Sequence, residues 1–348
     1  MNFRAPGRLL AMGAAAAFWL NAPAVAQDSV AQFYKGKQIT IIVGTAAGGG
    51  YDTYARFLAR HMGKHIPGNP GIIVSNMPGA GSNTAGAYIS KVAPKDGTVI
   101  GSIFGGAVIE PLIGTTTPQY DPSKLHYLGS ANDDVYVCLA RKDAAPQSFK
   151  ETLEKDIILG ASVASSSADF AAILKNTIGA KFKIVHGYNG SRNIMLAMEK
   201  NEVQGACGLA WPAINVTNPS WFGDKGFVRV IAQTHVKGHP ELNAMGVPLA
   251  SSFARNAEEK AILELYFSHT TFGRPYVVAN EVPTERVAAL RKAFMATLKD
   301  PDFITEARKV GLDIDAVDGD EVQKLIAGIY AASPELLAKV KKSLQMPE

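Results

Sequence analysis

The sequence has little excess charge of either sign. Its 35 lysine and arginine residues nearly balance 31 aspartate and glutamate residues, which gives a formal net charge of +4 over 348 residues. Two of these positive charges, Arg4 and Arg8, belong to the N-terminal segment. A chain so close to neutral lacks the electrostatic footprint of a protein that binds nucleic acid or an anionic membrane. Any anionic ligand must therefore be attracted locally, by a site.

Cysteine is also scarce, with Cys138 and Cys207 the only two in the chain. Both lie in apolar, strand-like runs. An oxidising compartment would permit a disulfide between them, but sequence does not show whether their Cα atoms come within bridging distance. We favour two buried thiols that act as small apolar side chains, and the disulfide stays open as the alternative.

The lysine of a nucleotide-binding P-loop is missing. The stretch GTAAGGGYD, residues 44–52, follows a β-branched run, but Tyr51 and Asp52 come after its glycines. A P-loop needs a lysine there, and an aspartate would repel a triphosphate. In a second loop, GAGSNTAG, the third glycine comes two places too late for a dinucleotide fingerprint. The sequence therefore argues against a bound nucleotide.

Catalytic and metal-binding motifs are missing as well. The nearest approach to the G-x-S-x-G turn of a serine hydrolase is GASVA at 160–164. His61 and His65, like His235 and His239, are four residues apart but lack the glutamate of a zinc protease, so we expect all four at the surface. The glycine loops contain no pair of carboxylates that could act as general acid and general base. We therefore predict no enzyme, no catalytic residue, no metal ligand and no cofactor.

A secretory signal peptide is present at the N-terminus. Arg4 and Arg8 precede an apolar stretch over 9–20. A small-residue cleavage signal of the A-x-A type follows it and ends at Ala26. This apolar core is shorter than the ~20 residues that a membrane-spanning helix needs. We predict that residues 1–26 are removed and that the mature protein is periplasmic. No cysteine follows this cleavage position, which argues against a lipid anchor.

Strand and helix patterns alternate after the signal peptide, which predicts an α/β fold with mostly parallel sheets. The first units read as strand 38–43, glycine loop 44–52 and a helix, then strand 71–76, glycine loop 77–83 and a helix. A fresh set of units starts near Asp134, with strands at 135–140, 157–161, 182–186, 203–211 and 228–233 and with loops at 162–167 and 187–191. The C-terminal third is rich in amphipathic helices that carry no chemistry.

The two glycine loops predict an anion site built from helix starts. Both loops follow neighbouring strands, and ligands bind at the carboxyl edge of an open parallel sheet. The first N–H groups of a helix lack partners and attract a carboxylate, which glycine lets approach closely. Three or four charge-assisted hydrogen bonds of ~1.5–3 kcal/mol each reach the ~8 kcal/mol of a micromolar complex. No formal cation is needed.

The motifs also resemble a known family. YKGKQITIIVGTAAGGGYDTYARFLARHM, NMPGAGSNTAGAYISKVAPKDGTVIG and the late LRKAF…DPDF…GLDI are similar to the Bug, or tripartite tricarboxylate transporter receptor, family of periplasmic solute-binding proteins. The resemblance covers nearly the whole mature chain and is most specific over residues 38–104. The sequence departs from the family at Tyr51, where members commonly have a small residue.

The resemblance implies a two-domain clamshell, the Venus flytrap of periplasmic binding proteins, that closes over a small carboxylate. Domain 1 would comprise 28–133 plus 250–348, and domain 2 would comprise 134–249. The matched loops would place ligand contacts at Ala47, Gly48, Gly49, Tyr51, Asp52, Gly81, Ser82 and Asn83 in one jaw, and at Ser165, Ser166, Ser167, Tyr188 and Asn189 in the other.

Several candidate site residues also fit a purely structural role in place of ligand binding. Tyr51, Phe104 and Trp211 would form an aromatic wall for an aromatic or longer-chain carboxylate, or else pack in the core or at the rim. The serine loop would bind an anion or cap the following helix. For Asp52 we favour a capping role, which asparagine would preserve, over contact with a ligand.

The function predicted from the resemblance is a receptor that delivers a small carboxylate to a tripartite membrane transporter. A binding protein that reports its ligand to a membrane sensor needs the same closing jaws and stays open. A periplasmic enzyme acting on carboxylates is the third alternative. We expect a monomer whose partners are the ligand and integral membrane permease subunits, with no nucleic acid.

Overall fold

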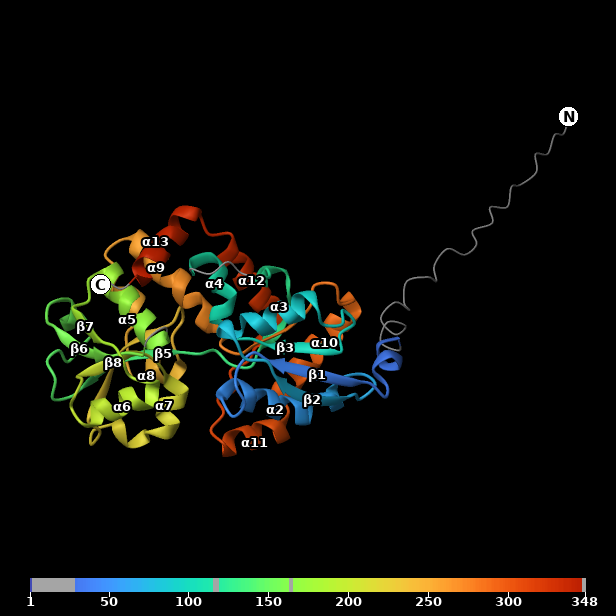
Figure 1. Ribbon diagram of the computed structural model, residues 1–348, viewed down its shortest axis with the longest axis horizontal. Helices are drawn as coiled ribbons and strands as arrows, with labels where there is room; N and C mark the ends of the chain where they lie inside the picture. The colour runs from blue at the N-terminus through green and yellow to red at the C-terminus, as the bar shows by residue number, and fades with distance from the viewer. Residues whose placement is uncertain (2–28, 115–118, 163–164, 346–348) are drawn as a thin grey trace.

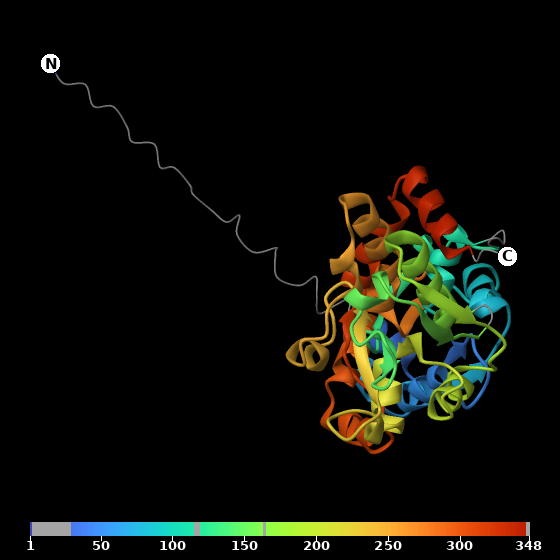
Figure 2. The ribbon, with the colours of Figure 1, turned by 90° about the vertical axis from the view of Figure 1, so that its left-hand side faces the viewer.

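The fold consists of two lobes that lie side by side along the long axis of the molecule (Figure 1). In this computed structural model, the described residues are Met1, 29–114, 119–162 and 165–345. Figure 2 views the molecule from the side of the second lobe, and there the two lobes overlap along the line of sight. The predicted signal peptide, apart from Met1, lies outside the described residues. Within them, no helix is both long and apolar enough to cross a membrane.

The first lobe is built on a six-stranded sheet with the order β11-β4-β10-β3-β1-β2. Its strands are β1 (Gln38–Val43), β2 (Gly71–Asn76), β3 (Val99–Ser102), β4 (His126–Ser130), β10 (Pro275–Val278) and β11 (Val317–Asp318). β1 pairs in parallel with β2 and β3, whereas β10 is antiparallel to β3 and β4, and β11 is antiparallel to β4.

The second lobe is built on a five-stranded sheet with the order β7-β6-β8-β5-β9. Its strands are β5 (Tyr136–Arg141), β6 (Ile157–Gly160), β7 (Phe182–Val185), β8 (Gly205–Ala210) and β9 (Val228–Thr234). β6 pairs in parallel with β7 and β8, and β5 is antiparallel to β8 and β9.

The predicted two-domain α/β clamshell is confirmed, but its sheets are mixed rather than mostly parallel. The antiparallel pairs involve strands next to the chain crossings: β4 and β5 flank the first crossing, and β10 follows the return. A strand that enters a lobe from the other lobe is not bound to the parallel β-α-β winding, so it can pair in either direction.

Helices flank both sheets. They are α2 (Gly50–Met62), α3 (Asn83–Lys91), α4 (Gly106–Ile113), α5 (Ser166–Ile178), α6 (Ser191–Glu199), α7 (Trp211–Thr217), α8 (Pro240–Ala244), α9 (Ala257–Phe267), α10 (Thr284–Leu298), α11 (Pro301–Lys309), α12 (Gly319–Tyr330) and α13 (Pro334–Leu344). Local sequence fixes several of their starts. Ser333 caps α13 and Asp300 caps α11, each followed by a proline that is suited to the first helical turn.

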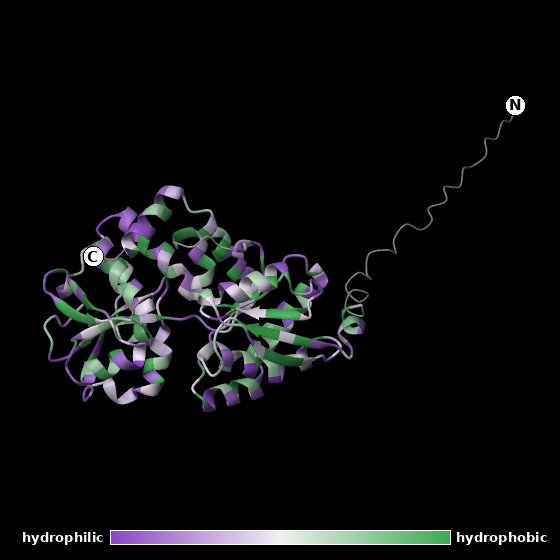
Figure 3. Ribbon diagram, viewed as in Figure 1, coloured by the Kyte–Doolittle hydropathy of each residue, from purple (hydrophilic) through white to green (hydrophobic). Residues whose placement is uncertain are grey.

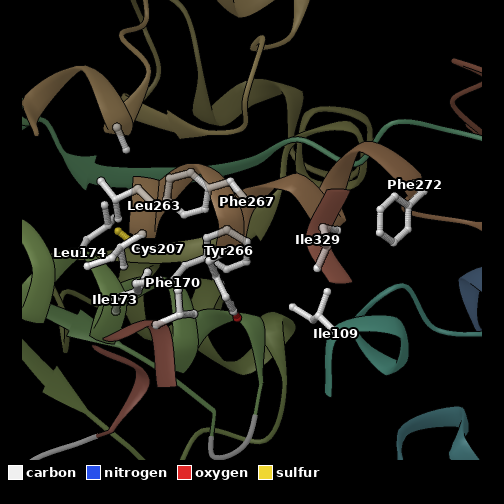
Figure 4. Packing of buried hydrophobic residues seen from close by; sticks show 14 of the residues in the cluster. Ile109, Phe170, Ile173, Leu174, Cys207, Leu263, Tyr266, Phe267, Phe272 and Ile329 are labelled. Atoms are coloured by element: carbon white, nitrogen blue, oxygen red, sulfur yellow. The ribbon is translucent and has the colours of Figure 1, made fainter. Parts of the chain in front are cut away.

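Hydrophobic residues concentrate on the strands and on the inner helix faces of both lobes (Figure 3). One buried cluster extends from the second lobe into the first, from Leu174 through Phe170 and Phe267 to Ile109 and Phe272 (Figure 4). The late helices α9 and α13 pack against α5 of the second lobe. The late helices therefore tie the two lobes together, while the predicted boundaries of the two domains stay a prediction.

The two cysteines form a disulfide, so the preference for two free buried thiols was wrong. Cys138 of β5 and Cys207 of β8 are bonded to each other, and both are fully buried. The two strands are adjacent and antiparallel, with an irregularity in register between Val137 and Leu139. This pairing brings the two Cα atoms to 3.9 Å, which sequence spacing could not reveal.

Two histidines expected at the surface are buried. His235 is 0% exposed, and its Nε2 lies 2.7 Å from the Asp133 carboxylate. Its Nδ1 accepts hydrogen bonds from the backbone N–H groups of Lys237 and Gly238. His61 is 8% exposed and packs against an aromatic ring of α11. Each histidine pair therefore contributes one ring that makes buried contacts within the fold.

Candidate functional site

Four helices begin where parallel strands end, two in each lobe. In the first lobe β1 leads into α2 and β2 leads into α3, and in the second lobe β6 leads into α5 and β7 into α6. β1 and β2 are paired in register up to Val43 and Asn76, and β6 and β7 are paired up to Gly160 and Val185. Each lobe therefore presents two neighbouring helix starts at one sheet edge, where free N–H groups favour an anion.

The two loops of the first lobe are in direct contact. Ser82 is buried, and its hydroxyl donates to the Gly44 carbonyl at 2.9 Å. A Cβ at Gly44 would lie 2.5 Å from the Ser82 hydroxyl oxygen, so only glycine allows this approach. The four residues 79–82 all have positive φ, including Ala80 at 44° and Ser82 at 77°. Such strained backbone persists where the surrounding contacts hold it, and it clusters at ligand-binding sites.

Asp52 holds the first glycine loop in place, but it does not cap α2. The N-cap is Gly49, and Asp52 is the third residue of the helix. Its carboxylate accepts from the Gly48 N–H at 2.8 Å, from Arg56 Nε at 2.9 Å and from Asn76 Nδ2 at 2.9 Å. Hydrogen bonds to the charged form, chiefly from Arg56, lower the pKa of Asp52 to about 2.

Replacing Asp52 with asparagine is therefore expected to destabilise the protein, contrary to the expectation for a simple cap. Asparagine has one acceptor oxygen and would turn its NH₂ group toward a donor, which costs about 1–3 kcal/mol in free energy of unfolding. The stabilisation from a lowered pKa is fully present above the usual pKa of aspartate and is lost as pH falls through about 2. Urea denaturation should show a clear deficit for Asp52→Asn at pH 7 that narrows in acid. An equal deficit at both pH values would contradict this role.

The loops of the second lobe are joined in a similar way. Ser162 donates its backbone N–H to the Ser167 hydroxyl at 2.9 Å, and its own hydroxyl accepts from the Gly190 N–H at 2.9 Å. The Ser165 hydroxyl lies 2.8 Å from that of Ser167, and the Ser166 hydroxyl donates to the Gly208 carbonyl. These hydroxyls shape the loop, and none of them caps α5, although Ser165 is its N-cap residue.

Two of the predicted aromatic residues meet, and the third lies elsewhere. The rings of Tyr51 and Phe104 are 6.0 Å apart, edge to face, and Phe104 is 37% exposed. Trp211 is 1% exposed, stacks edge to face on Phe222 and donates its indole N–H to Glu241. It packs in the core of the second lobe, which leaves Tyr51 and Phe104 as the candidates for the predicted aromatic wall.

Tyr51 links the first glycine loop to the joint between the lobes. Its hydroxyl donates to the Gly273 carbonyl at 2.6 Å and accepts from the Gly105 N–H at 3.3 Å. Burial is the main cause that raises its pKa. A small cavity at this joint is lined by Tyr51 and Phe104 of the first lobe and by Asp134 and Tyr136 at the entrance to the second.

Arg274 is the residue of this region that sequence reasoning missed. Its Nη1 donates to the Asp134 carboxylate at 2.8 Å, and its guanidinium lies 4.3 Å from the Tyr51 ring centroid. A Cβ at Gly50 would lie 3.4 Å from Nη2, so the cation borders the start of α2. Burial is the largest single influence and opposes its charge, but Asp134 together with the nearby tyrosines keeps the pKa of Arg274 above its usual value. The first jaw therefore has a formal cation beside its helix start, partly neutralised by Asp134.

A similarity to one curated protein covers part of the chain. No family model matches the sequence. The chain is 27% identical over 192 residues to a UPF0065 protein from the TAR-I ttuE-ttuC′ intergenic region of Agrobacterium vitis. The match covers 53% of this chain and 53% of that protein, so the chain spans about half the length of the curated relative it matches.

Solved structures give the stronger comparison. A TctC solute-binding protein from Polaromonas, without ligand, superimposes with a TM-score of 0.68 at 18% identity, over 88% of this chain and 99% of that one. The chain has the fold of the TctC and Bug periplasmic binding proteins. The Rpa4515 protein of R. palustris, solved with adipate, gives 0.61 at 19% identity over 88% and 97%. The periplasmic binding protein BugD gives 0.59 at 22% identity over 89% and 98%.

The resemblance to the Bug family is thus confirmed. Within this Bug fold the predicted residues of the four loops fall into two groups. Ala47, Gly48, Gly49 and Gly81 are exposed on the first-lobe loops, and Asn189 is exposed on a second-lobe loop. Asp52, Ser82, Asn83, Ser165, Ser166, Ser167 and Tyr188 are buried or half-buried supports of these loops. In the described parts of the chain, no hydrogen bond joins the first-lobe loops to the serine and Tyr188 loops.

Proposed function

We propose that the protein is a periplasmic solute-binding receptor that captures a small carboxylate between its two lobes and delivers it to a tripartite membrane transporter. The observation that carries this proposal is the pair of glycine-rich and serine-rich helix starts at one sheet edge of each lobe. Both jaws thus offer unpaired N–H groups to an anion. The adipate bound to the similar R. palustris protein supports a carboxylate as the ligand class.

The joint between the lobes suits a closing movement. Two short crossing segments, 131–134 and 270–274, run side by side and are bonded through Ala131 N–H to the Arg274 carbonyl at 3.0 Å and Asp134 N–H to the Thr270 carbonyl at 2.9 Å. A few residues in such segments can absorb the rotation of one lobe against the other. A ligand held by loops of both jaws binds the closed form better and shifts the population toward it.

Arg274 and the aromatic pair refine the proposed ligand. The cation next to Gly50 adds an electrostatic attraction that the helix starts alone do not supply. Tyr51 and Phe104 offer one apolar wall, whereas Trp211 packs in the core. We therefore propose a carboxylate with an apolar body, either aliphatic or aromatic, over a compact hydroxy acid. The same proposal includes integral membrane permease subunits as partners and a monomeric protein. It also includes the predicted domains, 28–133 plus 250–348 and 134–249.

A matched pair of glycine substitutions tests the proposed site. Gly81 and Gly36 both have positive φ, 60° and 71°, and a Cβ at either would point into open space. Each alanine variant should lose about 1–2 kcal/mol of stability from backbone strain. Only Gly81→Ala places a methyl group on a predicted ligand loop, so calorimetric titration with adipate, malate and benzoate should show weaker binding for this variant alone. Equal affinities in both variants would contradict a ligand at this loop.

A further inference from the structure

A separate groove lies on the second lobe, beside the edge strand β9. Its cavity volume is about 490 Å³, within the range of about 300–1,000 Å³ that is typical of ligand-binding pockets. Its floor is apolar and includes Phe149, Val230, Val247 and Phe253. Met245, which is 54% exposed, lies at its border. None of the residues predicted to bind the carboxylate lines this β9 groove.

One wall of the β9 groove is the open edge of a sheet. β9 is the last strand in the sheet order, and in the described part of the chain its strand partner is β5, apart from a single bridge between Gln233 and Leu249. Four consecutive residues, 228–231, line the groove. A register shift in the pairing with β5, between Cys138 and Leu139, interrupts the alternation of side chains along this run, and the run lies on the strand at the end of the sheet order. Beyond this run the edge of β9 is already occupied, because the Gln233 N–H donates to the Pro248 carbonyl at 2.9 Å.

The rim of the β9 groove is positively charged. Lys142, Lys150 and Arg229 line it. Lys142 Nζ donates to the Gly223 carbonyl at 2.6 Å, and Arg229 Nη1 donates to a backbone carbonyl at 3.3 Å. Within the described ranges, none of these three cations forms an ion pair with a carboxylate of this chain.

Two acidic residues close to the rim in sequence are engaged elsewhere, whereas Asp224, whose backbone carbonyl accepts from Lys142 Nζ at 3.3 Å, lies beside the Lys142 end of the rim. Asp143 lies 2.7 Å from Arg141, and Glu151 lies 3.0 Å from Lys155. The charges of Lys150 and Arg229 are therefore left for a partner to neutralise. An unpaired strand edge, an apolar floor and an uncompensated cationic rim are together what an extended acidic peptide would recognise.

We propose that the β9 groove binds an extended polypeptide segment with alternating acidic and apolar side chains, which adds a strand to the open edge of β9. The backbone of the segment pairs with residues 228–231. Its apolar side chains enter the floor, and its carboxylates meet Lys150 and Arg229. The groove thus gives the protein a docking surface for a protein partner, separate from the cleft between the lobes.

Synthetic peptides and charge reversal test this proposal. The full chain is titrated with a capped Glu-Val-Glu-Val-Glu-Val peptide and with its Lys-Val-Lys-Val-Lys-Val counterpart. The acidic peptide should bind saturably and the basic one should not. Lys150→Glu/Arg229→Glu should weaken binding of the acidic peptide about tenfold or more, because like charges would now meet. Both substituted side chains are exposed, so the variant should unfold at the temperature of the wild type.

Two controls separate the β9 groove from general electrostatics. Lys91→Glu/Lys292→Glu makes the same charge change at exposed positions of the first lobe and should leave peptide affinity unchanged. An acidic peptide methylated on alternate backbone nitrogens cannot pair with a strand edge and should not bind. The proposal is overturned if the acidic peptide fails to bind, if both charge variants lose affinity equally, or if the methylated peptide binds as well as the parent.

Discussion

Replacing Arg274 with methionine should lower the free energy of unfolding by about 3–5 kcal/mol, since it leaves one charge of a buried pair without its partner. The Asp134 side chain is 5% exposed and would lose its ion pair at 2.8 Å. Among the described residues, the hydrogen bond from Asn132 Nδ2 is the one that the Asp134 carboxylate would keep. The cation above the Tyr51 ring would also be lost, so the first glycine loop would loosen at the joint. Urea denaturation followed by circular dichroism measures the loss.

Two further variants separate this cause from a general effect of removing an arginine. Arg60→Met removes a partner of Glu306 from an ion pair whose side chains are 50% and 44% exposed, and it should cost no more than about 1 kcal/mol. Adding Asp134→Asn to Arg274→Met removes the stranded charge and should recover much of the stability. If the single and double variants at the joint are equally unstable, the buried charge is not the cause.

Removing the disulfide should cost about 2–5 kcal/mol of unfolding free energy. Cys138 and Cys207 are 69 residues apart, and cross-linking a loop of that size restricts the unfolded chain strongly. Cys138→Ala/Cys207→Ala is the suitable variant, because serine would place hydroxyls in a core where both positions are fully buried. The measurement is the urea midpoint of the variant and of the wild type, each with and without dithiothreitol.

The reductant supplies the control for this prediction. Dithiothreitol should lower the midpoint of the wild type toward that of the variant and leave the variant unchanged. Thiol titration of the denatured, unreduced wild type should find no free thiol. Two free thiols, together with a midpoint that ignores the reductant, would show that the cysteines are not bonded in the protein.

The first jaw could be predicted closely from the sequence because its signals are local. A β-branched run bounded by glycine marks β1, and the predicted limits 38–43 match the structure. β2 matches at 71–76 for the same reason. The short strands β10 and β11 were missed, because each holds few residues and is defined by its partner rather than by its own pattern.

The parts that depend on contacts across the fold could not be predicted. Arg274 follows a glycine and precedes a proline, a context that indicates only a turn, and its importance comes from Asp134, 140 residues away. Asp52 was taken for a cap because it precedes the apolar periodicity of α2. The helix in fact begins at Gly50, and Asn76 of the neighbouring strand gives the carboxylate its second role. Trp211 gave no signal that would separate a core position from a cleft position.

The central claim is that the protein binds a small carboxylate through unpaired backbone N–H groups and one nearby cation. A thermal-shift screen of mono-, di- and tricarboxylates, each paired with its uncharged amide, tests it most directly. A ligand at ~100 times its dissociation constant adds ~2.7 kcal/mol, which raises the unfolding temperature measurably. We expect at least one carboxylate to stabilise the protein and its amide to have no effect. Stabilisation by no carboxylate, or equal stabilisation by acid and amide, would contradict the account.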